Sequence, residues 1–210
     1  HLPMKEFPRF DRNVANTAGF HVTVEDAERC PRMTGTQIEN VCVKPAPYWM
    51  QVRIWKTGMR PINALVDITN YVMLATGQPS HAYDSDHIAG HIIVRRAKAG
   101  ETHKKGGFQL HFDDKWAPLL TKLLPTEIVR TDDLTIADDA GIVGLAGVMG
   151  GAKDSILPTT SRVILEIANF QAAGIRRTAL RYDNRTEASA RYEKAIDPER
   201  CDQALELSMQ

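Results

Sequence analysis

A single acidic residue interrupts an otherwise apolar run in the last quarter of the chain. Glu166 lies in SRVILEIANF (161–170), a short segment rich in β-branched residues that is typical of a strand. In a strand Glu166 shares a face with Ile164 and Ala168, and its carboxylate then needs a hydrogen-bond donor or water. Two interpretations stay open. One is an outward-facing glutamate on an edge strand, which is the commoner case, and the other is a buried acceptor for a ligand.

A second group of polar residues lies between residues 63 and 81. Asn63, Asp67 and Asn70 fall on one stripe of a predicted helix, which is either a wet outer face or the wall of a polar pocket. His81 follows on a short extended segment beside that stripe. A lone histidine is more often structural than catalytic, and the alternative is that His81 positions a ligand or water.

The segment LAGVMGG (145–151) is rich in glycine but lacks the spacing of a dinucleotide-binding loop. The sequence alone favours a tight turn between packed strands, and the alternative is a glycine-walled pocket whose backbone amides reach a ligand. Phosphate-loop, His-Glu-x-x-His and Gly-x-Ser-x-Gly signatures are absent. The common catalytic motifs therefore do not identify an activity.

The charge of the chain is balanced overall and uneven locally. With 26 basic and 26 acidic side chains, the composition excludes a protein that holds nucleic acid mainly by neutralising phosphates. Within one stretch of about twenty residues, however, basic side chains outnumber acidic ones, through Arg176, Arg177, Arg181, Arg185 and Arg191. This stretch is either a helix face with salt bridges or a contact for phosphates at one end of a nucleic acid.

Two helices are predicted between residues 47 and 77. Pro47 suits the start of the first and Gly58 its end, while Pro61 opens the second and Gly77 ends it. In the second helix, one stripe is predicted to face the core and consists of Ile62, Leu65, Val66, Thr69, Met73 and Thr76. The polar stripe and the core stripe lie on different faces of this helix.

Short β-branched segments predict strands around this helix pair, near residues 20–26, 37–44, 91–98, 133–138, 141–151 and 161–170. Most connections are too short for crossover helices, so we expect an α+β fold with mixed or antiparallel sheets and flanking helices. The last forty residues are predicted to be helical, with Asp197 as an N-cap. Residues 1–210 are interpreted as a single module, with a possible subdomain junction near 100–130.

The chain shows no sign of a membrane span or a secretion signal, so a cytoplasmic protein is expected. Its three cysteines, Cys30, Cys42 and Cys201, show no Cys-x-x-Cys spacing and are expected to be reduced and mostly packed. Histidines without an accompanying cysteine pair do not predict a metal site.

A longer run of residues carries a family resemblance. MRPINALVDITNYVMLATGQPSHAYD (59–84) closely resembles a segment of the β subunit of bacterial phenylalanyl-tRNA synthetase. The later segments VRRAKAGE, DLTIAD, LAGVMGGAKDS, VILEIANF, GIRRTALRYDNRTEAS and RYEKAIDPER follow in the order of that family's B3/B4 or editing domain. The resemblance runs from about residue 22 to the C-terminus and is weak near 103–128. HAYD and RYEK stand where the family usually has phenylalanine-containing forms, a conservative change.

The resemblance implies a three-layer B3/B4 module that hydrolyses tyrosine wrongly esterified to phenylalanine tRNA. Glu166 matches the family's acceptor for the tyrosine hydroxyl, and Gly147 matches a small residue on the pocket wall. His81, Asn70 and Arg60 are candidates for holding the attacking water. The matched positions around the ester end, the terminal adenosine and the rest of the wall are Arg60, Thr69, Asn70, His81, Thr186 and Ala188.

The same resemblance implies the partners: the aminoacylated 3′ end of phenylalanine tRNA, the remainder of the β subunit and the α subunit. No cofactor is expected in this module, because ATP and Mg belong to the parent ligase. One alternative is a non-catalytic scaffold or acceptor-stem contact with a vestigial pocket, and another is a freestanding trans-editor. The joint presence of the matched polar residues favours the hydrolytic interpretation over the scaffold. An excised domain is favoured over a freestanding protein. The zero net charge predicts that this chain alone binds tRNA weakly.

Overall fold

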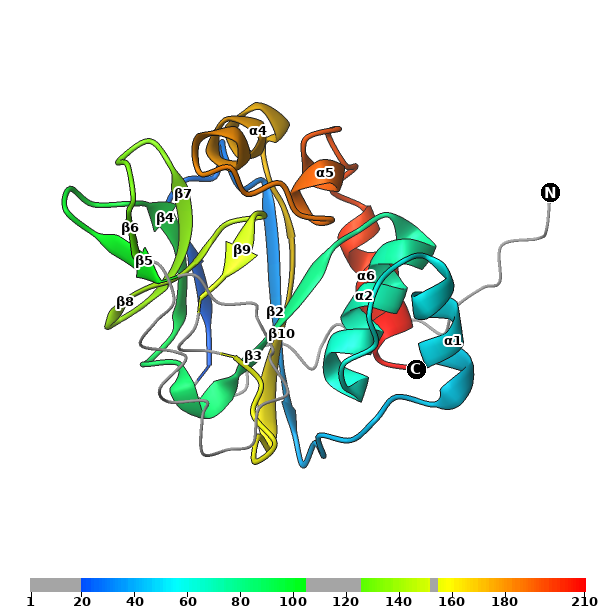
Figure 1. The fold of residues 1–210 in the computed structure, drawn as a ribbon. Helices are drawn as coiled ribbons and strands as arrows, with labels where there is room; N and C mark the ends of the chain where they lie inside the picture. Colours follow the sequence, from blue (N-terminus) through cyan, green and yellow to red (C-terminus); the bar gives the residue numbers. More distant parts are fainter. Residues whose placement is uncertain (1–19, 105–125, 152–154) are drawn as a thin grey trace.

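The computed structural model describes residues 20–104, 126–151 and 155–210, and these form three layers (Figure 1). A five-stranded sheet has the order β1-β4-β7-β8-β9, with strands Val22–Val24, Ile92–Arg96, Leu134–Asp138, Gly141–Leu145 and Met149–Gly150. A three-stranded sheet has the order β2-β10-β3, with strands Arg32–Glu39, Arg162–Asn169 and Ser80–Asp84. Thr102–Lys104 (β5) and Thr126–Ile128 (β6) form a separate pair.

Helices lie beyond the three-stranded sheet and across one end of the molecule (Figure 1). Helices α1, α2 and α6 form the outer layer and span Tyr48–Lys56, Ala64–Thr76 and Arg200–Ser208. Helices α4 and α5 cover the end, and span Ala172–Arg181 and Ser189–Tyr192. A short 3-10 helix, η2, covers Ser85–His87. Only β1 and β4 pair in parallel among the described strands, so the predicted α+β fold with mixed sheets and flanking helices is confirmed.

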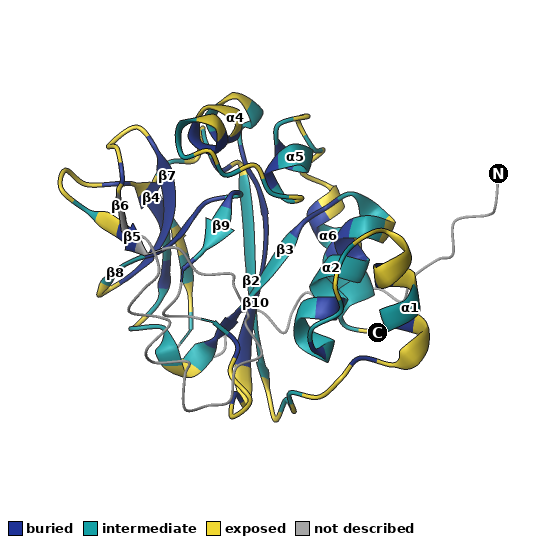
Figure 2. Ribbon diagram, viewed as in Figure 1, coloured by how far each residue is buried: buried dark blue, intermediate teal, exposed yellow. Residues whose placement is uncertain are grey.

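Strand β10 is the centre of the molecule and is buried on both faces. One face, which includes Ile164 and Ala168, packs in the core shared with the five-stranded sheet. The other, which includes Leu165 and Ile167, packs against α2 and α6. Figure 2 shows β10 buried over most of its length. Burial on two faces explains why this strand is almost continuously apolar, and it makes the single carboxylate of Glu166 exceptional.

The predicted helix boundaries are partly right. Helix α1 begins after Pro47, and Gly58 follows it with φ +85°, while Gly77 ends α2 in the left-handed conformation with φ +77°. The predicted start of α2 at Pro61 is wrong by three residues. The helix begins at Ala64 because the side chain of Asn63 accepts the Val66 backbone N–H at 3.1 Å and acts as its N-cap.

Two other local predictions need correction. The strand predicted near 37–44 is found at Arg32–Glu39, and it ends where Asn40 takes a positive φ of 58°. Asp197 accepts the Glu199 backbone N–H at 3.0 Å, and α6 begins later, at Arg200.

The junction predicted near 100–130 falls largely on 105–125, outside the described residues, and stays a prediction. Of the three free cysteines, Cys30 and Cys201 are buried and Cys42 is exposed.

No helix within the described parts of the chain is long and apolar enough to cross a membrane.

Candidate functional site

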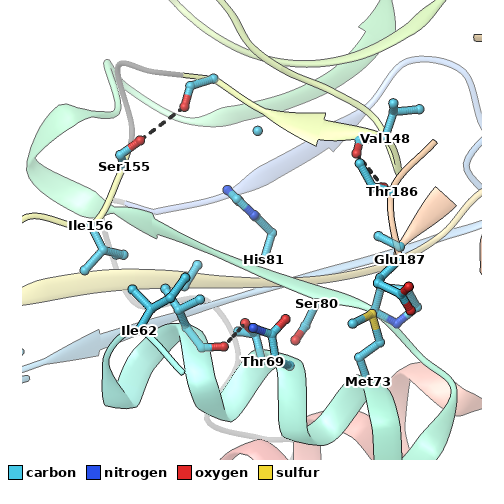
Figure 3. Close-up of a pocket in the computed structure, with 17 residues that line it drawn as sticks. Ile62, Thr69, Met73, Ser80, His81, Val148, Ser155, Ile156, Thr186 and Glu187 are labelled. Atoms are coloured by element: carbon cyan, nitrogen blue, oxygen red, sulfur yellow. Dashed lines mark hydrogen bonds between the residues drawn. The ribbon is translucent and has the colours of Figure 1, made fainter. Parts of the chain in front are cut away.

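Two adjoining cavities share a wall formed by strand β3 and the β9 region, and Figure 3 shows the outer one, which also borders helix α2. The outer cavity has a volume of about 310 Å³ and is bounded by α2, β3, residues 155–156 and residues 186–188. The inner cavity has a volume of about 100 Å³ and reaches the buried face of β10. Both cavities are lined by Pro79, Ser80, His81, Val148, Gly150 and Ala188, so they meet along this shared wall.

Glu166 lies on the wall of the inner cavity and is 5% exposed. In the sheet register it pairs with Gly35 of β2 on one side and with His81 of β3 on the other. The hydroxyl of Tyr83 donates a hydrogen bond to Glu166 Oε2. The outward-facing interpretation of Glu166 is therefore wrong, because β10 is a central strand and Glu166 lies on the face that packs toward the five-stranded sheet.

The negative charge of Glu166 affects the groups packed around it. Burial is the main reason that the pKa of Tyr192 lies well above its ordinary value, and the charge of Glu166 adds to the effect. Burial likewise raises the pKa of the Cys30 thiol to about 12, again with a contribution from Glu166. This carboxylate therefore lies in a dry environment, where a donor from a ligand interacts strongly.

His81 stands at the junction of the two cavities and projects from β3 into the space above α2 (Figure 3). Its ring packs edge-on against the ring of Tyr83, with centroids 4.5 Å apart. On another side it packs against Gly150, where an added Cβ would lie 2.7 Å from His81 Nε2 and Cε1. Glycine at position 150 is thus what allows the imidazole to occupy this position.

Helix α2 presents to the outer cavity the stripe that was predicted to face the core. The cavity-lining residues of this stripe are Ile62, Val66, Thr69 and Met73. The core contacts of α2 are made instead by a neighbouring stripe, through Ile68 and Val72. Met73 is buried as predicted, but Ile62, Val66 and Thr69 line the cavity, because a mostly apolar cavity wall and a core face have the same helical spacing.

The predicted polar stripe of α2 is divided between two roles. Asn70 lines the outer cavity, as one of the two interpretations expected. Asn63 caps the helix, and Asp67 is buried and accepts the Ile62 backbone N–H at 2.8 Å. Neither Asn63 nor Asp67 lines either of the two cavities.

Gly147 lines the inner cavity at the turn between β8 and β9, so LAGVMGG forms both a tight turn and a pocket wall. Its φ is +65°, and an added Cβ would lie 2.9 Å from Phe170 and 3.0 Å from Tyr192. A side chain at position 147 would therefore push against the rings that line the cavity, besides straining the backbone.

The other predicted site residues divide into those that the structure brings to the cavities and one that it does not. Thr186 lines the outer cavity and donates to the Val148 carbonyl at 2.9 Å, while Ala188 lines both cavities. Thr69 lines the outer cavity and donates to the Val66 carbonyl at 2.8 Å. Arg60 is exposed in the segment between α1 and α2 and lines neither cavity.

Most of the basic stretch near the C-terminus is engaged in ion pairs. Arg181 bonds both Asp132 and Asp133, and the other pairs are Arg185–Glu193 and Arg191–Glu187. Arg176 and Arg177 are exposed on α4. The structure thus favours the salt-bridged interpretation for three of the five arginines.

In the described residues, no three His, Cys, Asp or Glu side chains gather in a way that could hold a metal ion.

Sequence reasoning missed three residues that shape the inner cavity. Tyr83 lines it and bonds Glu166, Gly150 makes room for His81, and Ser80 lies on the wall shared by both cavities. A signal for Tyr83 was present, because it lies two residues after His81 and therefore on the same face of the strand. For Gly150 the only signal was its place in LAGVMGG, for which a pocket wall was one of two interpretations, because its contact with His81 joins segments far apart in the chain.

Comparison with known proteins identifies the family. A family model described as the B3/4 domain matches residues 29–210. The chain is 40% identical over 198 residues to the phenylalanine–tRNA ligase beta subunit of Solibacter usitatus, covering 94% of this chain and 24% of that protein. It is 42% identical to the same subunit of Leifsonia xyli over 187 residues, covering 86% and 20% of the two chains. It thus spans about a quarter or less of the length of these relatives.

Among solved structures, a similar one is the crystal structure of an N-terminal fragment of the phenylalanyl-tRNA synthetase beta subunit from Pyrococcus horikoshii. The identity is 11% and the TM-score is 0.45, over 77% of this chain and 46% of that one. The match of the family model over residues 29–210, together with homologues that are phenylalanine–tRNA ligase beta subunits, shows that the chain belongs to the B3/4 domain family.

Proposed function

We propose that this chain is an aminoacyl-tRNA editing domain, which hydrolyses the ester of tyrosine wrongly attached to phenylalanine tRNA. The observation that carries the proposal is Glu166, a carboxylate that is 5% exposed on the wall of a cavity of about 100 Å³. Burying a carboxylate costs free energy unless donors reach it, and Tyr83 supplies one donor to Glu166. A carboxylate has further lone pairs, so a cavity that ends on one suits a ligand that brings another donor. The phenol of tyrosine is such a ligand.

The need for this reaction follows from the chemistry of recognition. A pocket built for the phenylalanine ring cannot strongly reject an analogue that merely adds a hydroxyl. A second site that binds the hydroxyl with a buried polar group discriminates much better, because phenylalanine leaves that group without its partner. The names of the relatives, phenylalanine–tRNA ligase beta subunits, supply the class of substrate.

The two cavities suit two parts of one substrate. The phenol ring would occupy the inner cavity, with its hydroxyl at Glu166. The ester would lie beside His81, where the cavities meet, and the terminal adenosine would lie in the outer cavity of about 310 Å³. Thr69, Asn70 and Thr186 line the outer cavity near the ester end.

Hydrolysis of an aminoacyl ester does not need a strong nucleophile, because the ester is already activated. Holding one water near the carbonyl and aiming donors at the developing oxyanion provide much of the acceleration. His81 and Asn70 are the residues proposed for this positioning. Arg60 is proposed to contact the tRNA from outside the cavities, at the exposed segment that leads into α2. No protein general base and no cofactor are assigned.

The partners in this proposal are the aminoacylated 3′ end of phenylalanine tRNA, the rest of a β subunit and an α subunit, in the cytoplasm. Most of the tRNA affinity would come from those other parts. The chain itself has zero net charge, and three arginines of its basic stretch are paired with carboxylates.

The test is to follow deacylation of tyrosyl-tRNA and phenylalanyl-tRNA by the native protein that carries this sequence, with and without Glu166→Ala. We expect the wild type to prefer the tyrosyl ester and the variant to lose that preference by a factor of at least about one hundred, because the acceptor for the hydroxyl is gone. Attachment of phenylalanine to tRNA is expected to be unchanged.

A matched control is Glu187→Ala, which removes an exposed carboxylate at the outer cavity and is expected to leave the tyrosine preference unchanged. If Glu166→Ala clears tyrosyl-tRNA with the wild-type preference, the assignment of Glu166 is wrong. If the wild type clears neither ester, the domain is a non-catalytic scaffold. Deacylation by the isolated chain would identify a freestanding editor.

A further inference from the structure

Tyr83 is a tyrosine of the protein itself that engages the carboxylate proposed to recognise tyrosine. Its hydroxyl donates to Glu166 Oε2, and both side chains line the inner cavity. Both are also buried, at 2% and 5% exposure. A phenol hydroxyl from a substrate would therefore meet an acceptor that already has a phenol bound to it.

The sheet holds Tyr83 in this position. Tyr83 pairs with Ile164 and His81 pairs with Glu166, so Tyr83 and Glu166 are diagonal neighbours on the same face of adjacent strands. Diagonal neighbours across a strand pair are within reach of an aromatic side chain. The edge-on contact between the rings of Tyr83 and His81, with centroids 4.5 Å apart, further restrains the Tyr83 ring. The bond to Glu166 is thus a consequence of register and packing.

The selectivity of such a site depends on what happens to the carboxylate when the wrong ligand binds. If Glu166 had no internal donor, a ligand without a hydroxyl would leave it desolvated and unpaired, which is the main source of discrimination. Because Tyr83 supplies a donor from within the protein, Glu166 keeps a partner whichever ligand is bound. The penalty against a plain aromatic ring is then smaller.

We expect the hydroxyl of Tyr83 to share the carboxylate of Glu166 with a ligand hydroxyl, and not to block the ligand from it. An ionised carboxylate has about four lone-pair positions, so one donor does not exclude a second. Two donors to one carboxylate each bind less strongly than one alone, since each reduces the charge that the other meets.

We propose that Tyr83 is a selectivity-determining residue, whose hydroxyl shares Glu166 with the ligand and lowers the preference of the inner cavity for rings that carry a hydroxyl over rings that do not. The identity of the ligand rests on the proposed function. The effect of Tyr83 on hydroxyl recognition does not, because it follows from contacts within the cavity.

The first test is Tyr83→Phe in the native protein, which deletes the hydroxyl and keeps the ring. We expect the ratio of tyrosyl-tRNA to phenylalanyl-tRNA deacylation rates to rise about tenfold, the order of one hydrogen bond to a charged group. The same substitution in a Glu166→Gln background should leave the ratio unchanged, because the charge that both hydroxyls compete for is absent. A ratio that is unchanged or lower in Tyr83→Phe alone would overturn the proposal.

Tyr192→Phe is a matched control. Tyr192 is also buried and lines the inner cavity, but its single hydroxyl hydrogen is shared between the Pro79 and Ala168 carbonyl oxygens, each 3.1 Å from the hydroxyl oxygen. Absolute rates can fall in this variant, whereas the ratio is expected to stay at the wild-type value. A rise equal to that of Tyr83→Phe would overturn the proposal, because it would show that any lost hydroxyl near the cavity has the same effect.

A second measurement separates this inference from the editing activity. Binding of p-cresol and toluene to the protein, followed by ligand-observed NMR, compares a ring with and without the hydroxyl in the absence of tRNA. We expect Tyr83→Phe to increase the preference for p-cresol and Glu166→Ala to abolish it. If no ester is hydrolysed but this pattern is found, the proposed function fails and the role of Tyr83 stands. If the p-cresol preference does not respond to Tyr83→Phe, the role of Tyr83 is wrong.

Discussion

Glu166 in strand β10 and Asp67 in helix α2 are both buried carboxylates, 5% and 1% exposed, in elements that contribute to the same site. Glu166 lines the inner cavity and accepts from the hydroxyl of Tyr83. Asp67 lines neither cavity and accepts the backbone N–H of Ile62 at 2.8 Å. Burial alone thus does not distinguish a ligand acceptor from a structural one, whereas the cavity and the type of donor do.

The surroundings of Asp67 explain its structural role. It lies in the first turn of α2, where a negative charge interacts favourably with the helix dipole. Its bond to Ile62 fixes the chain just before the helix, and Ile62 is part of the outer cavity wall. The helix wall, which is α2 with the segment before it, therefore shapes the outer cavity. The sheet wall, which is β3 with β10, carries the groups proposed for recognition.

The largest effect that separates the two walls is expected from His81→Ala, compared with Asn70→Ala. Both residues line the outer cavity, but His81 also lines the inner one, where the ester of a bound substrate would lie. We expect His81→Ala to slow deacylation of tyrosyl-tRNA about a hundredfold, the size of the loss of one well-placed donor, and Asn70→Ala to slow it about tenfold. Single-turnover deacylation measures both.

The ratio of tyrosyl to phenylalanyl deacylation should persist in His81→Ala, because Glu166 remains. An equal loss of rate in Asn70→Ala would show that the helix wall contributes as much to the chemistry as the sheet wall, and would contradict the division of roles.

A smaller effect, on stability, is expected from Gly147→Ala compared with Gly58→Ala. Both glycines have a positive φ, +65° and +85°, so both substitutions strain the backbone by about 1 kcal/mol. At Gly58 no atom lies within 4 Å of the added Cβ, whereas at Gly147 it would lie 2.9 Å from Phe170. We expect Gly147→Ala to lower the free energy of unfolding by ~1–2 kcal/mol more than Gly58→Ala does. Urea unfolding of the full chain gives both values.

Equal losses at the two positions would show that the rings around Gly147 move aside easily, and would contradict the close contacts of the inner cavity with Phe170 and Tyr192. A larger loss at Gly147 together with weaker binding of p-cresol would confirm that the rings of Phe170 and Tyr192 fix the shape of the cavity.

The parts of the fold that follow from local rules could be predicted from the sequence. Gly77 in the left-handed conformation ends α2, and the β-branched run around Glu166 forms a strand. The start of α2 differs from the prediction because proline is a common first residue of a helix, whereas here the cap formed by Asn63 sets the start three residues after Pro61.

The arrangement of the site was less accessible to sequence reasoning. Whether Glu166 faced solvent depended on which layer packs on its face of β10, and packing against strands far away in the sequence leaves no local pattern. The stripe of α2 containing Val66 and Thr69 was assigned to the core because spacing shows only that a face is apolar. Family resemblance supplied candidate residues, but the contact between Tyr83 and Glu166 emerged only from the folded arrangement.

The smallest effect concerns the pH dependence of stability that Asp67 introduces. Burial raises the pKa of Asp67 above its ordinary value of 3.8, although the backbone bond from Ile62 opposes the shift. Between the unfolded and the folded pKa, the folded chain binds more protons than the unfolded chain, so the contribution of Asp67 to stability is present at low pH and is lost as the pH rises. We expect Asp67→Asn, which keeps an acceptor for Ile62, to gain stability relative to the wild type as the pH rises from about 4.

Urea unfolding of both proteins between about pH 3.5 and 7 measures this difference, since the amide that replaces the carboxylate carries no charge at any pH in that range. The gain is expected to level off above the folded pKa of Asp67, and the preference for tyrosyl over phenylalanyl esters is expected to stay unchanged. Parallel stability curves would show that the burial of Asp67 carries no electrostatic cost. A changed preference would show that Asp67 takes part in recognition, so that the two buried carboxylates differ less than their surroundings indicate.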